Sequence, residues 1–200
     1  MKNLSLCALA LLASVGCANA DDVAENSAAG ATSSPTSGPI TTAPTCRGFA
    51  ATIVGTNGND FLTGTPGPDV IVGLGGDDII AGFEGNDIIC GGAGNDTIRA
   101  GAGSDRVWGD EGDDTINGED DNDYIDGDGG NDTIFGGRGN DALVGGTERD
   151  RVYGDDGDDN LAGNDHDDML DGRLGVDTCD GGNHVLGDTA VNCETVVNVP

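Results

Sequence analysis

Residues 91–99 read GGAGNDTIR, and this stretch decides the fold of the chain. It holds three glycines, an Asn-Asp pair and one aliphatic residue, so taken alone it is too polar to bury anything. Closely similar nonapeptides follow one another from Gly55 to Asp180 without insertion or deletion, giving fourteen units over 126 residues. A fixed short period of this kind predicts a repeat architecture in which each unit is stabilised by its neighbours.

The columns of the repeat differ sharply in how much they vary. Position 6 is Asp in all fourteen units, and position 1 is Gly in thirteen, with Ala100 as the exception. Position 4 is Gly in eleven units and is replaced by Asp121, Glu148 and His166 in the others. Position 8 is Leu, Ile or Val in thirteen units, with Cys179 as the exception. Four fixed columns among variable ones indicate a defined structural role for each.

Each fixed column suggests a physical role. Glycine at positions 1 and 4 permits backbone angles closed to other residues, so six residues can form a tight turn with inward-facing carbonyls. Positions 7–9 would form a three-residue strand, in which side-chain alternation sends only position 8 inward. Because so short a strand is unstable alone, the pattern predicts an all-β parallel solenoid with an aliphatic column in its centre.

The predicted turns gather carbonyl and carboxylate oxygens in rows. Hard oxygen ligands in a flexible loop suit Ca²⁺, whereas Mg²⁺ demands tighter octahedral geometry. Zinc is disfavoured because His166 and His184 are isolated and the cysteines lack zinc-site spacing. The alternative is that the acidic positions only form a solvated face, but such a face would not keep one Asp fixed while its neighbours vary.

The units resemble the RTX, or haemolysin-type, calcium-binding nonapeptide GGxGxDxUx over residues 55–180. This resemblance implies a right-handed parallel β-roll with two nonapeptides per turn. Calcium would lie between one unit and the unit two further on, held by turn carbonyls and by both position-6 side chains. Fourteen units allow twelve such pairs, from Asp60 with Asp78 to Asp159 with Asp177, and hence up to about twelve ions.

The side-chain ligands that the resemblance implies are Asp60, Asp69, Asp78, Asp87, Asp96, Asp105, Asp114, Asp123, Asp132, Asp141, Asp150, Asp159, Asp168 and Asp177. The implied backbone carbonyl ligands are those of Gly73, Gly76, Gly82, Gly85, Gly91, Gly94, Gly109, Gly112, Gly127, Gly130, Gly136 and Gly139. Sites that involve Asp121, Glu148 or His166 are expected to bind more weakly, because these residues lack the free backbone of glycine.

Charge and composition agree with a cation partner. The 200 residues include 37 Asp or Glu against 8 Lys or Arg, giving a formal net charge of −29, and only 4% are aromatic. Low hydrophobicity with high net charge is typical of a chain that does not fold unaided, and the acidity argues against a nucleic-acid partner. Twelve calcium ions would carry 24 positive charges, so the calcium-free chain is expected to be largely unfolded.

The first 45 residues predict export and a spacer. Residues 1–20 combine Lys2, a short apolar run and a small-residue ANA site, as in a secretory signal peptide. The segment SVGC (14–17) is similar to a bacterial lipobox, which would make Cys17 a lipid anchor, and both processing outcomes stay open. Residues 21–45 read as a Ser/Thr/Pro-rich flexible linker. The expected location is extracellular or, alternatively, lipid-anchored at the bacterial cell surface.

Both ends of the solenoid need caps. Residues 46–54 have the length of a unit and place Ile53 in the position-8 column, whereas residues 181–200 begin like a unit, slip by about two residues and end in the apolar stretch TVVNV. Four cysteines lie beyond the leader and allow three disulfide connectivities. We favour Cys46–Cys90 and Cys179–Cys193, although Cys179 could also be a small core residue.

Outward positions carry two further features. Units 2–4 are apolar at outward positions as well as at position 8, which indicates either cover by the cap around Phe49 or a partner surface. Phe135 and Tyr153 share position 9 two units apart and are expected to be stacked neighbours.

No enzyme signature is present in the sequence. The zinc-protease motif HExxH is absent, and GAGSD (101–105) fails G-x-S-x-G because Arg106 follows it. Two functions therefore remain, a calcium-binding structural or surface module and a calcium-stiffened adhesin with an unknown cell-surface or extracellular partner.

Overall fold

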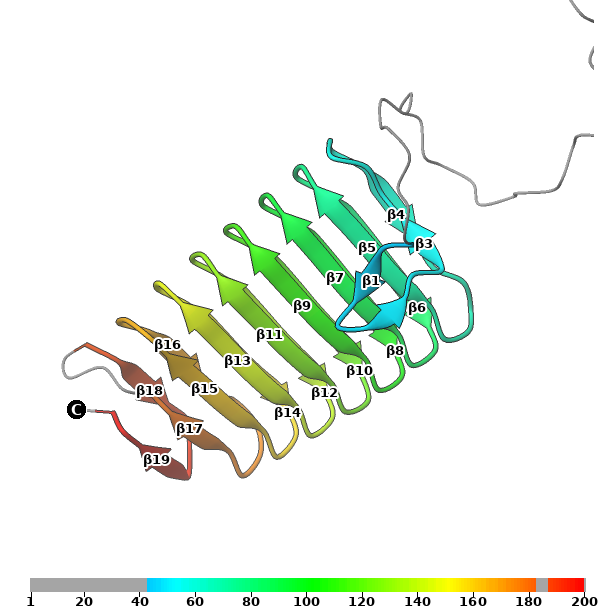
Figure 1. Cartoon of the computed structure of the whole chain (residues 1–200). Helices are drawn as coiled ribbons and strands as arrows, with labels where there is room; N and C mark the ends of the chain where they lie inside the picture. The colour runs from blue at the N-terminus through cyan, green and yellow to red at the C-terminus, as the bar shows by residue number, and fades with distance from the viewer. Residues whose placement is uncertain (1–42, 183–186, 200) are drawn as a thin grey trace, which may run out of the picture.

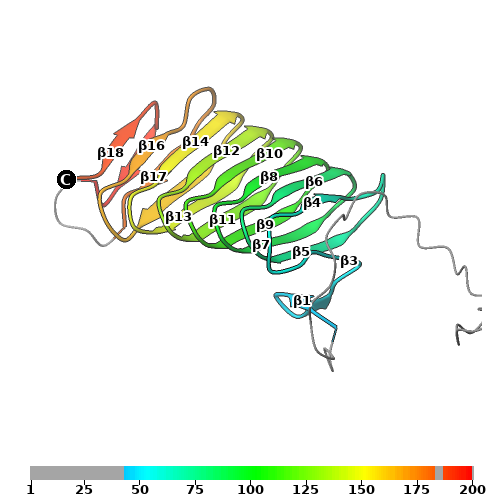
Figure 2. The ribbon, with the colours of Figure 1, turned by 90° about the horizontal axis from the view of Figure 1, so that it is seen from above.

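The repeats form a parallel roll of two sheets. Figure 1 shows the strands of the roll side by side, and Figure 2 shows the roll from above. The computed structural model describes residues 43–182 and 187–199. The predicted signal peptide, the lipobox at Cys17 and most of the linker lie outside the described residues. Within the described ranges there is no helix of a length and hydrophobicity that would let it span a membrane.

One sheet has eight strands and the other nine, and a small antiparallel hairpin lies beside them. The eight-stranded sheet contains β4 (Phe61–Thr63), β6 (Ile79–Glu84), β8 (Thr97–Ala102), β10 (Thr115–Asp120), β12 (Thr133–Arg138), β14 (Arg151–Asp156), β16 (Met169–Asp171) and β18 (Thr189–Val191). The nine-stranded sheet contains β3 (Ile53–Val54), β5 (Val70–Gly75), β7 (Ile88–Ala93), β9 (Arg106–Glu111), β11 (Tyr124–Gly129), β13 (Ala142–Thr147), β15 (Asn160–Asn164), β17 (Thr178–Asp180) and β19 (Thr195–Val197). The hairpin consists of β1 (Thr45–Cys46) and β2 (Phe49–Ala50).

The register confirms the predicted β-roll with two nonapeptides per turn. In every repeat pair the Cα partners are 18 residues apart, as for Ile116 with Ile98 on one side and Ile134 on the other. Fourteen units alternate between the two sheets, and the caps add β3, β18 and β19 at the ends. The roll therefore has about eight turns, slightly more than the nonapeptides alone provide.

The position-8 residues form the predicted aliphatic column between the sheets. All fourteen, from Leu62 to Cys179, are buried, and none is more than 3% exposed. Ile53 packs against the N-terminal end of this column and pairs with Ile71, as its place in the cap predicts. Because each unit contributes one side chain, the core is continuous only when the turns are stacked.

The strands are twice as long as predicted. Most contain six residues, positions 7–9 of one unit and positions 1–3 of the next, so the turn is confined to positions 4–6. The chain can remain in the ladder because position 2 adopts a left-handed backbone in every unit from the third to the fourteenth, for example Leu74 (φ 80°) and Gly101 (φ 120°). This local kink turns the strand without breaking the pairing that follows it.

The prediction that position 1 needs glycine for its backbone angle is wrong. The φ of position 1 is not left-handed, whereas position 4 is left-handed as expected from the third unit to the fourteenth, for example at Gly94 (φ 126°). Position 1 instead lacks space, since a Cβ added to Gly109 would lie 2.7 Å from the carbonyl oxygen of Gly127 in the next turn. Close approach between turns therefore explains this column.

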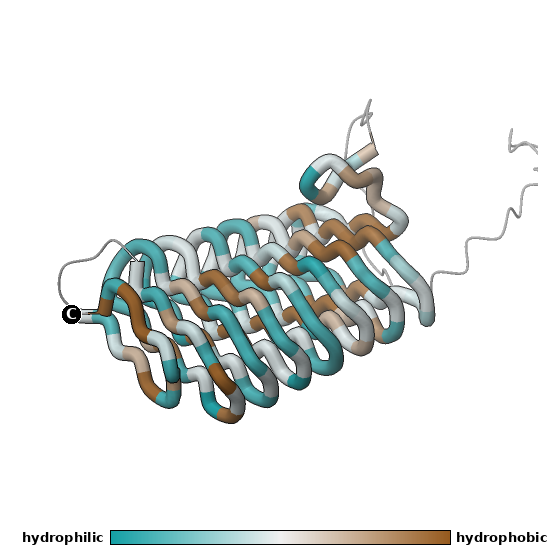
Figure 3. Tube along the Cα trace, turned by 90° about the horizontal axis from the view of Figure 1, so that it is seen from below, coloured by the Kyte–Doolittle hydropathy of each residue, from teal (hydrophilic) through white to brown (hydrophobic). Residues whose placement is uncertain are grey.

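The N-terminal hairpin covers one end of the nine-stranded sheet. The predicted disulfide Cys46–Cys90 joins β1 to β7, and Cys46, Val72 and Cys90 form a second buried cluster. Hydrophobic residues gather at this end of the roll beneath the hairpin (Figure 3). The cap therefore covers the outward residues of units 2 and 4, whereas Ile79 of unit 3, on the other sheet, remains 49% exposed.

The C-terminal cap continues the roll with irregular spacing. β18 pairs with β16 and β19 pairs with β17, both in parallel, and the second predicted disulfide, Cys179–Cys193, ties this end together. The predicted strand in TVVNV is confirmed as β19.

Candidate metal centre

The position-6 aspartates form two columns, one along the edge of each sheet where its strands begin. Each Asp lies immediately before a strand, so units of odd and even number place their carboxylates at opposite edges of the roll. All fourteen are buried, with at most 8% of each residue exposed. Burying this many carboxylates costs free energy unless each is compensated by hydrogen bonds or by a cation.

One oxygen of each carboxylate links successive turns. Oδ1 of Asp78 accepts a hydrogen bond from the backbone N–H of Asp60 at 2.8 Å. The same bond recurs in all twelve pairs that lie 18 residues apart, at 2.7–2.9 Å. The two aspartates of each predicted pair are therefore in contact. The contact joins the backbone amide of one aspartate to the carboxylate of the other.

The second oxygen has no partner. Oδ2 is buried and makes no hydrogen bond in thirteen aspartates, which are Asp78, Asp87, Asp96, Asp105, Asp114, Asp123, Asp132, Asp141, Asp150, Asp159, Asp168, Asp177 and Asp188. A buried polar atom without a partner costs roughly 1–3 kcal/mol, and more if it is charged. Twelve of these atoms belong to the twelve predicted pairs, one per pair. So regular a set of unpaired oxygens indicates positions for a cation.

The unpaired oxygens of the repeats lie close to the position-1 residue of the same unit, which is glycine in every unit but that of Asp105, where it is Ala100. A Cβ added to Gly109 would collide with Oδ2 of Asp114 and with the carbonyl of Gly127. The position-1 carbonyl of the next turn thus lies beside Oδ2, in the same small space. The predicted carbonyl ligands all lie 2.2–2.8 Å from the Cβ position of a position-1 glycine in the preceding turn, and they are those of Gly73, Gly82, Gly91, Gly109, Gly127 and Gly136.

The position-4 carbonyls lie elsewhere in the turn. The carbonyl oxygens of Gly76, Gly94 and Gly112, for example, face the position-4 glycine of the following turn. Those of Gly85 and Gly139 do the same, while Gly130 precedes a unit with Glu148 in this place. A role for these carbonyls and that of Gly130 as ligands stays a prediction.

The aspartate columns favour protons when no cation is present. Burial raises the pKa of Asp114 to about 8, and repulsion from the carboxylates of Asp132 and Asp96 adds to the rise. Burial likewise raises the pKa of Asp105 to about 7 and those of Asp123 and Asp150 to about 8. An ionised column is therefore unfavourable in the folded chain unless positive charge is supplied.

In the first turn of the roll, threonine residues donate hydrogen bonds to the Oδ2 atoms, which have no such partner in the later turns. Oδ2 of Asp60 accepts hydrogen bonds from the amide and hydroxyl of Thr56, at 2.5 and 2.9 Å. Thr65 does the same for Asp69, at 2.7 and 2.9 Å. Thr56 and Thr65 occupy position 2, which is not left-handed in these two units. The two aspartates at the start of the ladder are thus satisfied by the protein, a distinction that the repeat pattern does not reveal.

The irregular units keep the same backbone path. Asp121, Glu148 and His166 adopt left-handed φ values of 79°, 69° and 86° at position 4. Such angles cost a non-glycine residue about 1–2 kcal/mol. Arg149 forms an ion pair with Asp167 in the following turn, at 3.0 Å. Weaker binding at these units stays a prediction, now with strain as its physical reason.

Two acidic residues extend the ladder beyond the predicted set. Asp188 is buried, and its Oδ1 accepts a hydrogen bond from the Asp168 amide at 3.1 Å. Glu194 accepts one from the Asp177 amide at 2.8 Å. Both were missed because their spacings are 20 and 17 residues instead of 18. The GGxxxxGD pattern at residues 181–188, two residues longer than the Gly-to-Asp part of a regular unit, is the signal that could have revealed Asp188.

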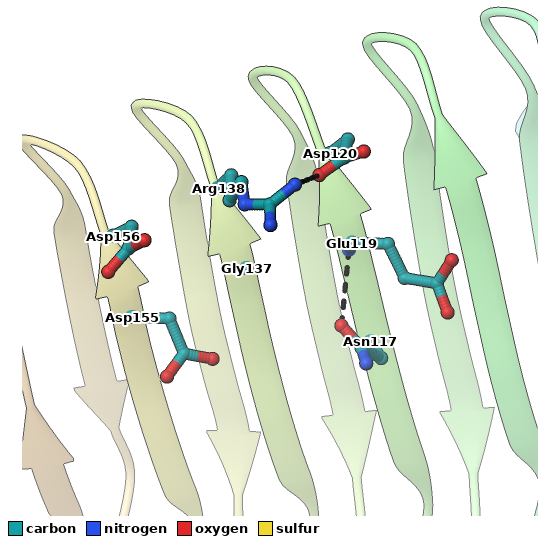
Figure 4. Close-up of a pocket in the computed structure, with 7 residues that line it drawn as sticks. All are labelled: Asn117, Glu119, Asp120, Gly137, Arg138, Asp155 and Asp156. Carbon is teal, nitrogen blue, oxygen red and sulfur yellow. Dashed lines mark hydrogen bonds and ion pairs between the residues drawn. The ribbon is translucent and has the colours of Figure 1, made fainter.

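A second acidic cluster lies on the outer face of β10, β12 and β14 (Figure 4). It lines an open cavity of about 420 Å³, where Arg138 pairs with Asp120 at 2.9 Å. These two side chains are 75% and 52% exposed, so water solvates them and the pair contributes little. Buried, unpaired oxygens distinguish the aspartate columns from this surface.

The donor set in the columns fits calcium. Among residues 43–182 and 187–199, no three His, Cys, Asp or Glu side chains converge as a ready-made site. A cation in the columns would need backbone carbonyls as ligands beside the carboxylates, and such all-oxygen shells are typical of Ca²⁺. The unpaired Oδ2 atoms would supply the negative charge for it, and the carbonyl oxygens close to the position-1 glycines would supply neutral oxygen donors.

Comparison with protein families gives one result. The model of the RTX calcium-binding nonapeptide repeat (4 copies) matches seven overlapping segments, at residues 50–65, 54–89, 63–98, 82–116, 91–125, 108–143 and 144–179. Together they span residues 50–179, about two thirds of the chain. A search of curated proteins finds no match. The chain belongs to the family of RTX calcium-binding nonapeptide repeat proteins, and its repeats form the calcium-binding β-roll of that family.

Proposed function

We propose that the chain is an exported β-roll that folds when its aspartate columns bind calcium, and that it serves as an extracellular structural or surface module. The observation that carries the proposal is the set of thirteen buried Oδ2 atoms without a partner. With calcium beside them these atoms gain ligands, whereas without it they oppose folding.

Charge balance supports the coupling of folding to calcium. The folded roll confines fourteen of the chain's 37 acidic residues to two narrow columns. Since calcium binds the folded chain in preference to the unfolded one, its binding free energy adds to the free energy of folding. The aspartates from Asp78 to Asp177 would supply one oxygen each to the predicted positions, and in units such as those of Asp78 and Asp114 the position-1 carbonyl of the following turn would supply another.

A calcium titration followed by far-ultraviolet circular dichroism tests this proposal. We expect little strand signal in calcium-free buffer and a cooperative gain at roughly 10⁻⁴–10⁻³ M calcium, the range of extracellular modules. Magnesium at the same concentration is the control, and it should produce a much smaller change. Strand content that stays the same after chelation would contradict the proposal.

The expected number of ions is about twelve, one for each Asp pair in the repeats. Native mass spectrometry in calcium counts the bound ions and detects oligomers in the same spectrum. A count of two or three would mean that most of the unpaired Oδ2 atoms are satisfied in some other way.

Export is the second part of the proposal. Two disulfides join the four cysteines beyond the leader, and persistent disulfides are typical of oxidising compartments outside the cytosol. The mass of the mature protein decides how the leader is processed. A chain that begins at Asp21 would result from cleavage after ANA, whereas a lipidated chain that begins at Cys17 would be anchored to the cell surface.

A calcium-stiffened adhesin is the alternative, favoured by one observation. Phe61, Ile79 and Phe83 are 56%, 49% and 54% exposed on the eight-stranded sheet near the N-terminal end of the roll. Replacing all three with serine should abolish binding to cell-surface material if they form a partner surface, and should leave the calcium titration unchanged. Equal binding by the parent and the triple variant would favour the structural module.

A further inference from the structure

The aspartate ladder continues into the C-terminal cap, beyond the last nonapeptide. β18 pairs with β16 in the register of the repeats, with Thr189 opposite Met169. Asp188 therefore precedes β18 as Asp168 precedes β16. The two residues are 20 positions apart in sequence, yet the Asp168 amide donates to Oδ1 of Asp188 at 3.1 Å, as in the regular pairs.

Asp188 also reproduces the unpaired oxygen of the repeats. It is 7% exposed, and its Oδ2 is buried without a hydrogen-bond partner. A Cβ added to Gly181 would lie 2.5 Å from this Oδ2 and 2.9 Å from the carbonyl oxygen of Asn198. Gly181 thus takes the role of a position-1 glycine, and the Asn198 carbonyl takes the place of the carbonyl from the next turn.

The other column ends differently. Glu194 accepts a hydrogen bond from the Asp177 amide at 2.8 Å, which matches the Oδ1 contact of the repeats. Glu194 is exposed, however, and neither of its carboxylate oxygens is both buried and unpaired. Water can solvate Glu194, so this column closes without a further cation. The contrast isolates Asp188 as the acidic residue of the cap that resembles the repeat sites in both contact and burial.

We propose that Asp188 holds one additional calcium ion at the C-terminal end of the roll, together with the Asn198 carbonyl. This inference rests on the proposed calcium-dependent folding, but it adds a site outside the nonapeptides and outside residues 50–179. The ion joins the turn before β18 to the segment after β19, so the cap itself becomes dependent on calcium. The total rises from twelve to thirteen ions.

Native mass spectrometry of the full mature chain in saturating calcium tests the site with Asp188→Asn. The asparagine keeps an oxygen that can accept from the Asp168 amide and removes the charge at Oδ2. We expect the variant to bind one ion fewer than the parent. Asp165→Asn is the matched control, because Asp165 is an exposed acid outside both columns in the same part of the chain, and its count should equal that of the parent.

The outcomes separate this inference from the proposed function. An unchanged count in Asp188→Asn, while Asp78→Asn loses an ion, overturns the C-terminal site and leaves calcium binding by the repeats intact. A parent chain that binds no calcium overturns both. If Asp188→Asn folds poorly, crystals of the unmodified protein soaked in terbium decide the question. A terbium peak beside Oδ2 of Asp188 supports the site, and peaks confined to the repeat columns overturn it.

Discussion

At position 6 of each nonapeptide the two oxygens of one carboxylate have separate roles. Oδ1 accepts an amide hydrogen bond from the preceding turn and fixes the spacing between turns, as in Asp114 with the amide of Asp96. Oδ2 of the same residue stays buried without a partner. A residue with only one acceptor oxygen could hold the turns but could not bind an ion, which explains why Asn does not replace Asp in this column.

The repeat pattern predicts which residues line the columns, but not this division of roles. All fourteen aspartates could be identified because one column is invariant within a single chain. That Thr56 and Thr65 satisfy the first two aspartates could not be predicted, since it depends on a local difference in φ at position 2. The left-handed position 2 was also hidden, because Leu74, Phe83 and Glu119 occupy it as readily as glycine does.

Gly109→Ala tests the close approach at position 1. The added methyl group would meet Oδ2 of Asp114 and the carbonyl of Gly127, so we expect the calcium midpoint for folding to rise several-fold. Ala100 already carries such a methyl in unit 6, buried in the aliphatic core, so the variant should still fold at high calcium. Gly129→Ala is the control, because its nearest atoms would be 3.6 Å away and its midpoint should not change. Equal midpoints for the two variants would contradict a steric role.

At the level of elements, the roll depends on what protects its two ends. Strand type, parallel pairing and the 18-residue register follow from the period of the sequence. The six-residue strand length does not, since it depends on a kink at position 2 that allows positions 1–3 to stay in the ladder. The geometry of the N-terminal cap is even harder to predict from the repeat pattern. The hairpin is held by contacts between distant residues, such as that of Arg47 with Asp110 at 2.9 Å, 63 residues away.

The Cys46–Cys90 disulfide should control how firmly the hairpin covers the sheet. Arg47, in the turn of the hairpin, lies 5.2 Å from the ring centroid of Trp108. Since Trp108 is the sole tryptophan of the chain, tryptophan fluorescence reports on the position of the hairpin. Replacing Cys46 and Cys90 with serine should shift the emission of Trp108 to longer wavelength and lower stability by about 2–4 kcal/mol. Replacing Cys179 and Cys193 is the control, and it should leave the emission unchanged. A shift in both variants would mean that the whole roll has loosened.

On the scale of the whole molecule, we expect protons and calcium to compete for the same buried oxygens. The folded chain raises the pKa of Asp114, Asp123 and Asp150 to about 8 and that of Asp78 to about 6, mainly through burial. In an unfolded chain these groups would titrate near the ordinary value of 3.8. Between these limits the folded state binds more protons than the unfolded state, so without calcium its stability falls as pH rises.

Acid should therefore replace calcium in part. In buffer freed of calcium, we expect more strand signal by circular dichroism at pH 5 than at pH 8, with the loss centred between about pH 6 and 8. With saturating calcium the dependence should reverse, because protons then displace the ion, and the calcium midpoint should be higher at pH 5 than at pH 8. A calcium-free chain that is equally unfolded at both pH values would show that self-repulsion outside the columns, and not the buried carboxylates, prevents folding.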